Sequence, residues 1–406
     1  MDVRNYIRNN WKHSIRTKNK LGNSIPVPFP YTSPCAEGLF DELYYWDTYF
    51  LNRGLLQDKE FEQVKNNILD ISYLISIYGF MPNAARYDML TRSQPPFFIA
   101  MVADYIEKTK DNSILKDTIS SMNKEMEFWI NDRSVIIDNK TLFQYRNNAT
   151  SDFAKNFAKE FEERVKYLVD SNEEKEIIGS NALGECESGW DFSPRFNQRI
   201  LNFIPIDLNS IIYFNFLTLD KFNNECNYKA SYDYKKMAND IKEFLDDHSL
   251  KDGIYFDYDF INNKTSEVVS MASFFPYKFG LCDSKENYDK LYYKLAHEYG
   301  LATTEKAEKI NYQWSYPNVW PNLVLVAFDG AKRIKNFEKC VDSARIFTNC
   351  VEKDYQKTHK LWEKYDAILG EKSRKNEYVE TEMLGWTAGT YSVLYDYLKE
   401  SKNEEN

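Results

Sequence analysis

Apolar residues spaced three and four positions apart recur along most of this chain, and this helical period constrains its fold more than any other feature. Glu62–Tyr78 shows the period most clearly, and Gly79 follows as a helix stop. Similar patterns predict helices at Leu208–Leu219, Tyr234–Phe244, Tyr288–Tyr299, Leu323–Ile334, Phe337–Tyr355 and Trp386–Leu398. Gly253–Asp259 alternates and predicts a short strand, but the sequence contains no run of βαβ units. We therefore expect an all-α bundle, solenoid or toroid of paired helices.

The sequence shows no boundary between domains. Its 406 residues are enough for one large domain or two ordinary ones, and no linker rich in Pro, Gly or Ser divides them. A polar opening leads into a proline-rich stretch from Pro26 to Pro34, which proline restricts to an extended conformation. We predict a single domain over residues 1–406 with an N-terminal arm at about 1–36.

Charge and composition exclude several kinds of partner. The net charge of −10 disfavours nucleic acids and anionic membranes, and no apolar run approaches the roughly 18 residues of a membrane span. Met1–Arg16 is polar throughout, unlike a signal peptide. The six cysteines are scattered without a CxxC pair, and histidines and cysteines show no metal-ligand spacing. We therefore expect a cytoplasmic protein with reduced thiols and without a metal or other cofactor; the oligomeric state stays open.

Two acidic segments far apart in the sequence carry the strongest chemical signal. Asp191 lies in Glu187–Ser193, and Glu377 precedes Gly385–Thr387, so that each carboxylate has aromatic residues and glycine nearby. Hydrolysis of a glycosidic bond needs two such groups, one to protonate the leaving oxygen and one to activate water or attack the sugar. Aromatic residues, 16% of the chain, would supply flat faces for a sugar ring, although an aromatic core accounts for much of this composition.

Five segments between about residues 38 and 390 carry a family resemblance. They are Phe40–Phe50 with Gly54-Leu55; Gly79–Asn83 with Arg92–Phe98; Glu187–Ser193 with Arg195 and Pro205–Asn209; Gln313-Trp314 with Pro317–Pro321; and Glu377-Tyr378 with Gly385–Gly389. Each segment alone is a weak signal, but all five in this order resemble the trehalase family, glycoside hydrolase family 37.

The resemblance implies an (α/α)6 barrel, which is a toroid of six helix pairs, and an inverting mechanism. By position, Asp191 matches the family's general acid and Glu377 matches its general base. The predicted substrate contacts are Trp46, Asp47, Asn83, Arg92, Ser93, Gln94 and Gly189, with Trp314 as a further aromatic contact. In an inverting enzyme the two carboxyl groups stand about 6.5–9.5 Å apart, which leaves room for a water molecule.

The residue types fit these roles. The aromatic residues on either side of Asp191 would desolvate it and raise its pKa, so that it stays protonated until it donates. Glu377 has to be ionised to take a proton from water. Arg92 would hold sugar hydroxyls and counter the charge of Asp47 or Glu377.

Structural explanations stand beside the catalytic ones. Asp191 could cap a helix, Glu377 could belong to a solvated charged loop, and the tryptophans could be core residues. Glu187 and Glu380 are the alternative carboxylates if the match to the family is shifted.

The chain departs from the family at several positions that usually hold charged groups. Leu39 and Asp41 stand where the first signature usually has arginine. Other departures are Tyr145–Thr150, which lacks a segment rich in Arg and Pro with a Glu, and Ser315, Thr381, Met383 and Leu384. Because lost hydrogen bonds to hydroxyls can cost orders of magnitude in specificity, we hypothesise that the hydrolytic centre is kept, and it stays open whether the substrate is trehalose or differs from it.

Three functions follow from these observations. The first is an inverting α-glycosidase whose partner is a small sugar, trehalose or a related α-glucoside. The second is a hydrolase of another α-glycoside such as glucosylglycerate, whose anionic aglycone would need Arg86 or Arg146. The third is a non-catalytic sugar-binding protein, which the presence of both Asp191 and Glu377 disfavours. A phosphorolytic enzyme would replace the base with a phosphate site, so Glu377 argues against it.

Overall fold

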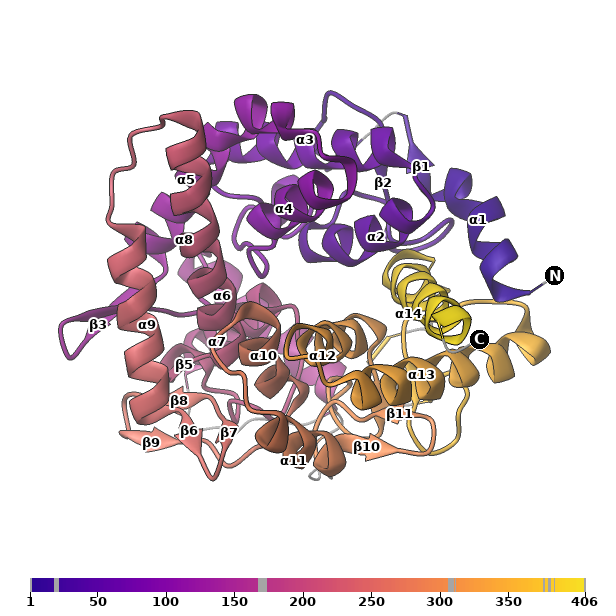
Figure 1. Ribbon diagram of the computed structural model, residues 1–406. Coiled ribbons are helices and arrows are strands. Elements are labelled where there is room, and N and C mark those ends of the chain that lie inside the picture. Colours follow the sequence, from indigo (N-terminus) through magenta and orange to yellow (C-terminus); the bar gives the residue numbers. More distant parts are fainter. Residues whose placement is uncertain are drawn as a thin grey trace.

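The fold is a closed double ring of helices (Figure 1). It is seen in a computed structural model that describes residues 2–17, 22–166, 174–305, 310, 312–374, 377–378, 381–382 and 384–404. The inner ring consists of α2 (Tyr45–Gln57), α4 (Phe98–Thr109), α8 (Ile206–Cys226), α10 (Phe275–Phe279), α12 (Pro321–Arg333) and α14 (Gly385–Glu404). Their outer partners are α3 (Phe61–Tyr78), α5 (Leu115–Asp132), α9 (Tyr234–His248), α11 (Lys285–Leu295), α13 (Phe337–Thr358) and α1 (Val3–Ser14). The expected all-α toroid of six helix pairs, an (α/α)6 barrel, is confirmed.

The two ends of the chain close the ring. α14 packs on α2, and α1, which lies within the segment expected as an arm, packs on the outside of α14. Arg4 of α1 donates hydrogen bonds to Asp396 of α14 at 2.9 and 3.1 Å and pairs with Asp58, directly after α2, at 2.6 Å. The seam therefore joins residues from both termini.

Helical periodicity located most of these helices, and tertiary pairing decided where some of them end. α3 matches its prediction, since Gly79 takes a left-handed φ of 87° and its N–H bonds the carbonyl of Ile75. The expectation of one helix over Tyr288–Tyr299 was wrong, because α11 ends at Leu295 and the next residues form a hairpin. The single strand expected at Gly253–Asp259 is divided between two different small sheets.

Short strands form hairpins and small sheets in the connections between helices. They are β1 (Ile15–Arg16), β2 (Tyr31–Thr32), β3 (Ser134–Ile137), β4 (Lys140–Phe143), β5 (Phe203–Ile204), β6 (Leu250–Lys251), β7 (Ile254–Tyr255), β8 (Tyr258–Asp259), β9 (Lys264–Thr265), β10 (Ala296–His297), β11 (Gly300–Leu301), β12 (Asn318–Val319) and β13 (Tyr365–Asp366). The pairs β1–β2, β3–β4, β6–β7, β10–β11 and β12–β13 and the three-stranded sheet β5–β8–β9 are all antiparallel. No described helix is both long and apolar enough to cross a membrane.

A helical hairpin stands outside the six pairs. α6 (Ser151–Val165) and α7 (Lys175–Ser188) pack against each other between β4 and the 3-10 turn η3 (Ile200–Asn202), around a small core of their own. Gly179 permits the close approach, because a Cβ there would lie 1.8 Å from the carbonyl oxygen of Ala154. This α6–α7 hairpin carries Arg164 of the candidate site, and Asp191 follows shortly after its end.

Candidate active site

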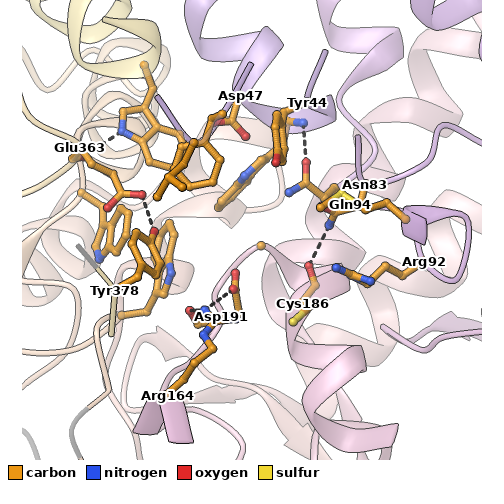
Figure 2. Close-up of a pocket in the computed structure, with 18 of the residues that line it drawn as sticks. Tyr44, Asp47, Asn83, Arg92, Gln94, Arg164, Cys186, Asp191, Glu363 and Tyr378 are labelled. Carbon is orange, nitrogen blue, oxygen red and sulfur yellow. Dashed lines mark hydrogen bonds and ion pairs between the residues drawn. The ribbon is translucent and has the colours of Figure 1, made fainter. Parts of the chain in front are cut away.

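A cavity of about 410 Å³ lies where the α6–α7 hairpin meets the barrel (Figure 2). Its wall combines side chains from α2, α6, α7 and α14 with side chains from several connections. The sequence-predicted residues that line it are Trp46, Asp47, Asn83, Arg92, Gln94, Gly189, Asp191 and Trp314. Arg164 and Glu363, which the sequence did not single out, line it as well, and so does Trp386 from the last family-like segment.

Asp191 reaches the cavity through a turn at the end of α7. The helix ends at Ser188, and Gly189 takes a left-handed φ of 75° that redirects the chain. Since Asp191 follows the C-terminus of α7, the N-cap explanation does not apply to it. Its side chain is 29% exposed, and its Oδ2 accepts a hydrogen bond of 2.7 Å from Nη2 of Arg164.

Glu377 lies behind Asp191, with its side chain 0% exposed. Its Oε1 accepts hydrogen bonds from the backbone N–H groups of Phe192 at 3.2 Å and Gln313 at 3.1 Å, while its Oε2 lies 3.1 Å from Nη2 of Arg164. Burial raises the pKa of Glu377 to about 7, against the lowering effect of Arg164; Asp191 raises it and the two amides lower it. The carboxyl group is thus fixed by one oxygen and faces a cation with the other.

A guanidinium nitrogen bridges the two carboxylates. Asp191 and Glu377 each place one oxygen within 2.7 and 3.1 Å of the same Nη2 of Arg164, so these oxygens lie closer together than the roughly 6.5 Å that separates an inverting pair. The expectation that Arg92 would counter Glu377 was wrong, because Arg164 makes that ion pair. The guanidinium of Arg92 instead donates to Thr91 at 3.1 Å at the cavity wall.

Tryptophan rings form one wall of the cavity. Trp314 and Trp320 stack with ring centroids 3.6 Å apart, and Trp46 lies 5.6 Å from Trp314. Trp386, at the start of α14, meets Trp46 edge to face at 6.2 Å. All four rings are buried in the main core cluster and also line the cavity, so their core and site roles coincide.

Acidic groups lie beside the tryptophan wall. The pKa of Asp47 is raised to about 8, mainly by burial and in addition by the charges of Glu363 and Asp191. Glu363 accepts a hydrogen bond from the hydroxyl of Tyr378 and pairs with Lys364 at 2.6 Å. Nothing in the sequence around Glu363 distinguishes it from the many other acidic residues of the chain.

Amide side chains hold the opposite side of the cavity. Asn83 donates to the carbonyl of Cys186 at 3.2 Å, and Gln94 accepts from the backbone N–H of Trp46 at 3.1 Å. Ser93 is fully buried, and its hydroxyl donates to the carbonyl of Met81 at 2.7 Å. Ser93 therefore holds the loop that carries Arg92 and Gln94, although it was predicted to contact substrate.

The alternative carboxylates do not compete with Asp191 and Glu377. Glu187 is fully buried, pairs with Arg133 at 2.9 Å, and accepts from the backbone N–H groups of Ser93 and Arg146. It joins α7 to the neighbouring loops rather than facing the cavity. Glu380 lies outside the described residues.

The two arginines considered for an anionic aglycone have other partners. Arg86 pairs with Asp88 at 3.0 Å, and the guanidinium of Arg146 donates to the side chain of Gln144 at 3.0 Å. Leu39, one of the positions where the family usually has arginine, lines the cavity and is 60% exposed.

An (α/α)6 barrel with paired carboxylates beside a tryptophan wall defines a glycoside hydrolase built on a helical toroid. The sequence model of the trehalase family matches residues 2–399. The trehalase of Apis mellifera is 30% identical over 95% of this chain, and the periplasmic trehalase of Pseudomonas aeruginosa is 28% identical over 96%. The chain spans 66% of the length of the first and 75% of the second. The chain therefore belongs to the trehalase family.

Solved structures agree with this fold. The neutral trehalase of Saccharomyces cerevisiae superposes with a TM-score of 0.77 at 21% identity, over 98% of this chain and 80% of the yeast chain. A family 63 mannosylglycerate hydrolase from Thermus thermophilus superposes with a TM-score of 0.64 at 14% identity, over 97% of this chain and 100% of its own. At these identities, the structural likeness is one of fold.

Proposed function

We propose that the protein hydrolyses trehalose, or a closely related small α-glucoside, with the inversion that the family resemblance implies, although the two carboxyl oxygens lie closer together here than in an inverting pair. Asp191 is the general acid and Glu377 the general base. The observation that supports this assignment most is the convergence of these two carboxylates, from distant parts of the sequence, on one guanidinium beside a cavity walled by stacked tryptophans. The choice of trehalose as the substrate rests on the relatives that are named trehalase.

The hydrogen bonds of Glu377 assign its two oxygens different tasks. Oε1 is occupied by two backbone N–H groups, so Oε2 is the oxygen that takes a proton from water. As the water oxygen bonds the anomeric carbon, the glycosidic C–O bond breaks and Asp191 gives its proton to the leaving oxygen. The partial exposure of Asp191 fits a position on the leaving-group side, and the burial of Glu377 limits its access to solvent.

The sugar that is cleaved lies against the tryptophan wall in this proposal. Trp46 and Trp314 offer apolar ring faces, and Asp47, Asn83 and Gln94 offer hydrogen-bonding groups for hydroxyls. Because Arg86 and Arg146 are engaged elsewhere, a neutral leaving group is favoured over an anionic one such as glycerate.

Proton NMR of the purified chain with trehalose tests the proposal. We expect β-glucose to appear alongside α-glucose from the first turnovers, before mutarotation, and both to vanish with Asp191→Ala and with Glu377→Ala. Glu163→Gln, which removes an exposed carboxylate from α6, should leave the rate unchanged. Release of α-glucose alone, or unimpaired turnover by either alanine variant, would contradict it.

A cytoplasmic location is part of the proposal. The six cysteines are free in the structure, as is usual in a reducing compartment. Relatives named periplasmic trehalase make the opposite location a concrete alternative. Cell fractionation with an antibody against the chain distinguishes the two.

A further inference from the structure

We propose that Arg164 is the positioning residue for both carboxyl groups, acting as counter-ion of Glu377 before the reaction and of Asp191 after it. This inference rests on the proposed function, since it assigns a task to Arg164 within that reaction. Arg164 lies on α6 of the α6–α7 hairpin. The charged residues around it in the sequence are typical of an ordinary solvent-exposed helix face.

The position of the guanidinium is well defined. Its Nη2 lies 2.7 Å from Oδ2 of Asp191 and 3.1 Å from Oε2 of Glu377 (Figure 2 shows Arg164 directed at Asp191). The guanidinium carbon Cζ of Arg164 lies 4.6 Å from the ring centroid of Phe192 and 5.9 Å from the ring centroid of Tyr378. The two aromatic rings and the two carboxylates thus fix the guanidinium so that its Nη2 lies within reach of Oδ2 of Asp191 and of Oε2 of Glu377.

Inverting hydrolysis keeps one negative charge on the carboxyl pair but moves it. The mechanism requires Glu377 to be ionised and Asp191 to carry the proton before the reaction; afterwards Glu377 holds the proton taken from water and Asp191 has lost its own. A cation fixed beside only one group would favour only one of these states. Nη2 of Arg164 faces an oxygen of each, so the charge meets the same cation before and after transfer.

The other ionisable groups described near the two carboxylates do not perform this role. Within the described residues, it is the cation that stands within 4 Å of both carboxylates. Glu185 of α7 also acts on Glu377, but burial raises its pKa to about 8, so it is largely neutral near pH 7. Across the cavity, Asp47 is likewise held protonated by burial, and Glu363 is paired with Lys364.

The test is the pH profile of kcat/KM for trehalose in the wild type, Arg164→Met and Arg164→Lys. In the wild type, activity should fall to half near pH 7 on the acidic side, because Glu377 must be ionised. Arg164 lowers the pKa of Glu377, so Arg164→Met should move this midpoint upward by about one pH unit and reduce kcat about 10²-fold. Arg164→Lys retains the charge and should hold the midpoint within about 0.3 units while kcat falls about tenfold.

Lys155→Met is the matched control. It removes a cation from the same helix, but Lys155 is exposed and, among the described residues, pairs with Glu176 at 3.7 Å, so neither the midpoint nor kcat should change. A wild-type midpoint in Arg164→Met, or an equal loss in the Met and Lys variants without a midpoint shift, would overturn the inference. If Arg164→Met does not fold, a midpoint shift of a full unit in Arg164→Lys overturns it instead. Absence of trehalose turnover in the wild type would count against the proposed function itself.

Discussion

Gly189→Ala should damage both the stability and the site, because two separate constraints meet at this residue. Gly189 ends α7 with φ of 75°, a conformation that L-residues with a Cβ rarely adopt. A Cβ here would also lie 2.6 Å from Cε2 and Cζ2 of the Trp46 ring. Trp46 cannot retreat easily, since Trp314 and Trp386 pack against it.

The size of the effect follows from these two constraints. A left-handed backbone costs a non-glycine residue about 1–2 kcal/mol. Overpacking against a buried ring costs about 1–3 kcal/mol more. Gly79→Ala supplies the matched control, because Gly79 also caps a helix, with φ of 87°, but a Cβ there meets no atom within 4 Å. We therefore expect Gly79→Ala to lose only the first amount and Gly189→Ala to lose both.

Urea unfolding followed by tryptophan fluorescence measures both losses, and trehalose kinetics measures the effect on the site. Gly189→Ala should raise KM as Trp46 is displaced, whereas Gly79→Ala should leave the kinetics unchanged. Equal losses of unfolding free energy in the two variants, with wild-type KM in both, would refute the reasoning from the Trp46 contact.

Three further predictions concern the cavity rim, a buried acid and the seam. Leu39→Arg places a hydrogen-bond donor at the cavity rim where the family usually has one, and should raise kcat/KM for trehalose about tenfold; an unchanged value in the same assay would contradict it. Burial raises the pKa of Asp70 to about 7, above its unfolded value, so its contribution to stability is present below about pH 4 and is lost as the pH rises through 7. Asp70→Asn should therefore show a smaller fall in unfolding free energy between pH 4 and 8 than the wild type. An equal fall of the unfolding free energy in the two proteins would contradict the role given to Asp70. Arg4→Met leaves Asp58 without its buried partner and should cost about 3 kcal/mol in urea unfolding. Arg8→Met removes a 53% exposed partner of the same Asp58 and should cost less than about 1 kcal/mol; similar losses would show that burial is not decisive.

The helical period predicted much of the fold because it reports which face of a segment is buried. It located α3 to within one residue, and it failed at Tyr288–Tyr299, where the last part of the apolar pattern belongs to a hairpin. That hairpin depends on pairing with Gly300-Leu301, which a local pattern does not contain. The ring order and its closure by α1 and α14 likewise depend on contacts between the two ends of the chain.

The candidate site, too, was predicted only in part from the sequence, because some of its residues depend on tertiary contacts. Family-like segments led to Asp191, Glu377 and the tryptophans, and the structure brings these together. Arg164 was missed because it follows two glutamates on an amphipathic helix, and only the packing of α6 on α7 brings it to the carboxylates. Ser93 was predicted to contact substrate because it lies within such a segment, yet its contacts are with buried backbone and Glu187.

The last of those segments shows why chemistry and packing cannot be separated by sequence motif. Gly389 lies one turn after Trp386 on α14, and a Cβ there would come within 2.1 Å of the carbonyl oxygen of Phe50 on α2. Gly54 of α2 faces Gly389 in turn, since its Cβ would lie 2.7 Å from the Cα of Gly389. These glycines let the first and last inner helices touch, and that contact sets Trp46 and Trp386 side by side in the cavity wall. The seam that closes the barrel is therefore also part of the cavity wall, so under the proposed function a loosened seam should weaken substrate binding before the barrel unfolds.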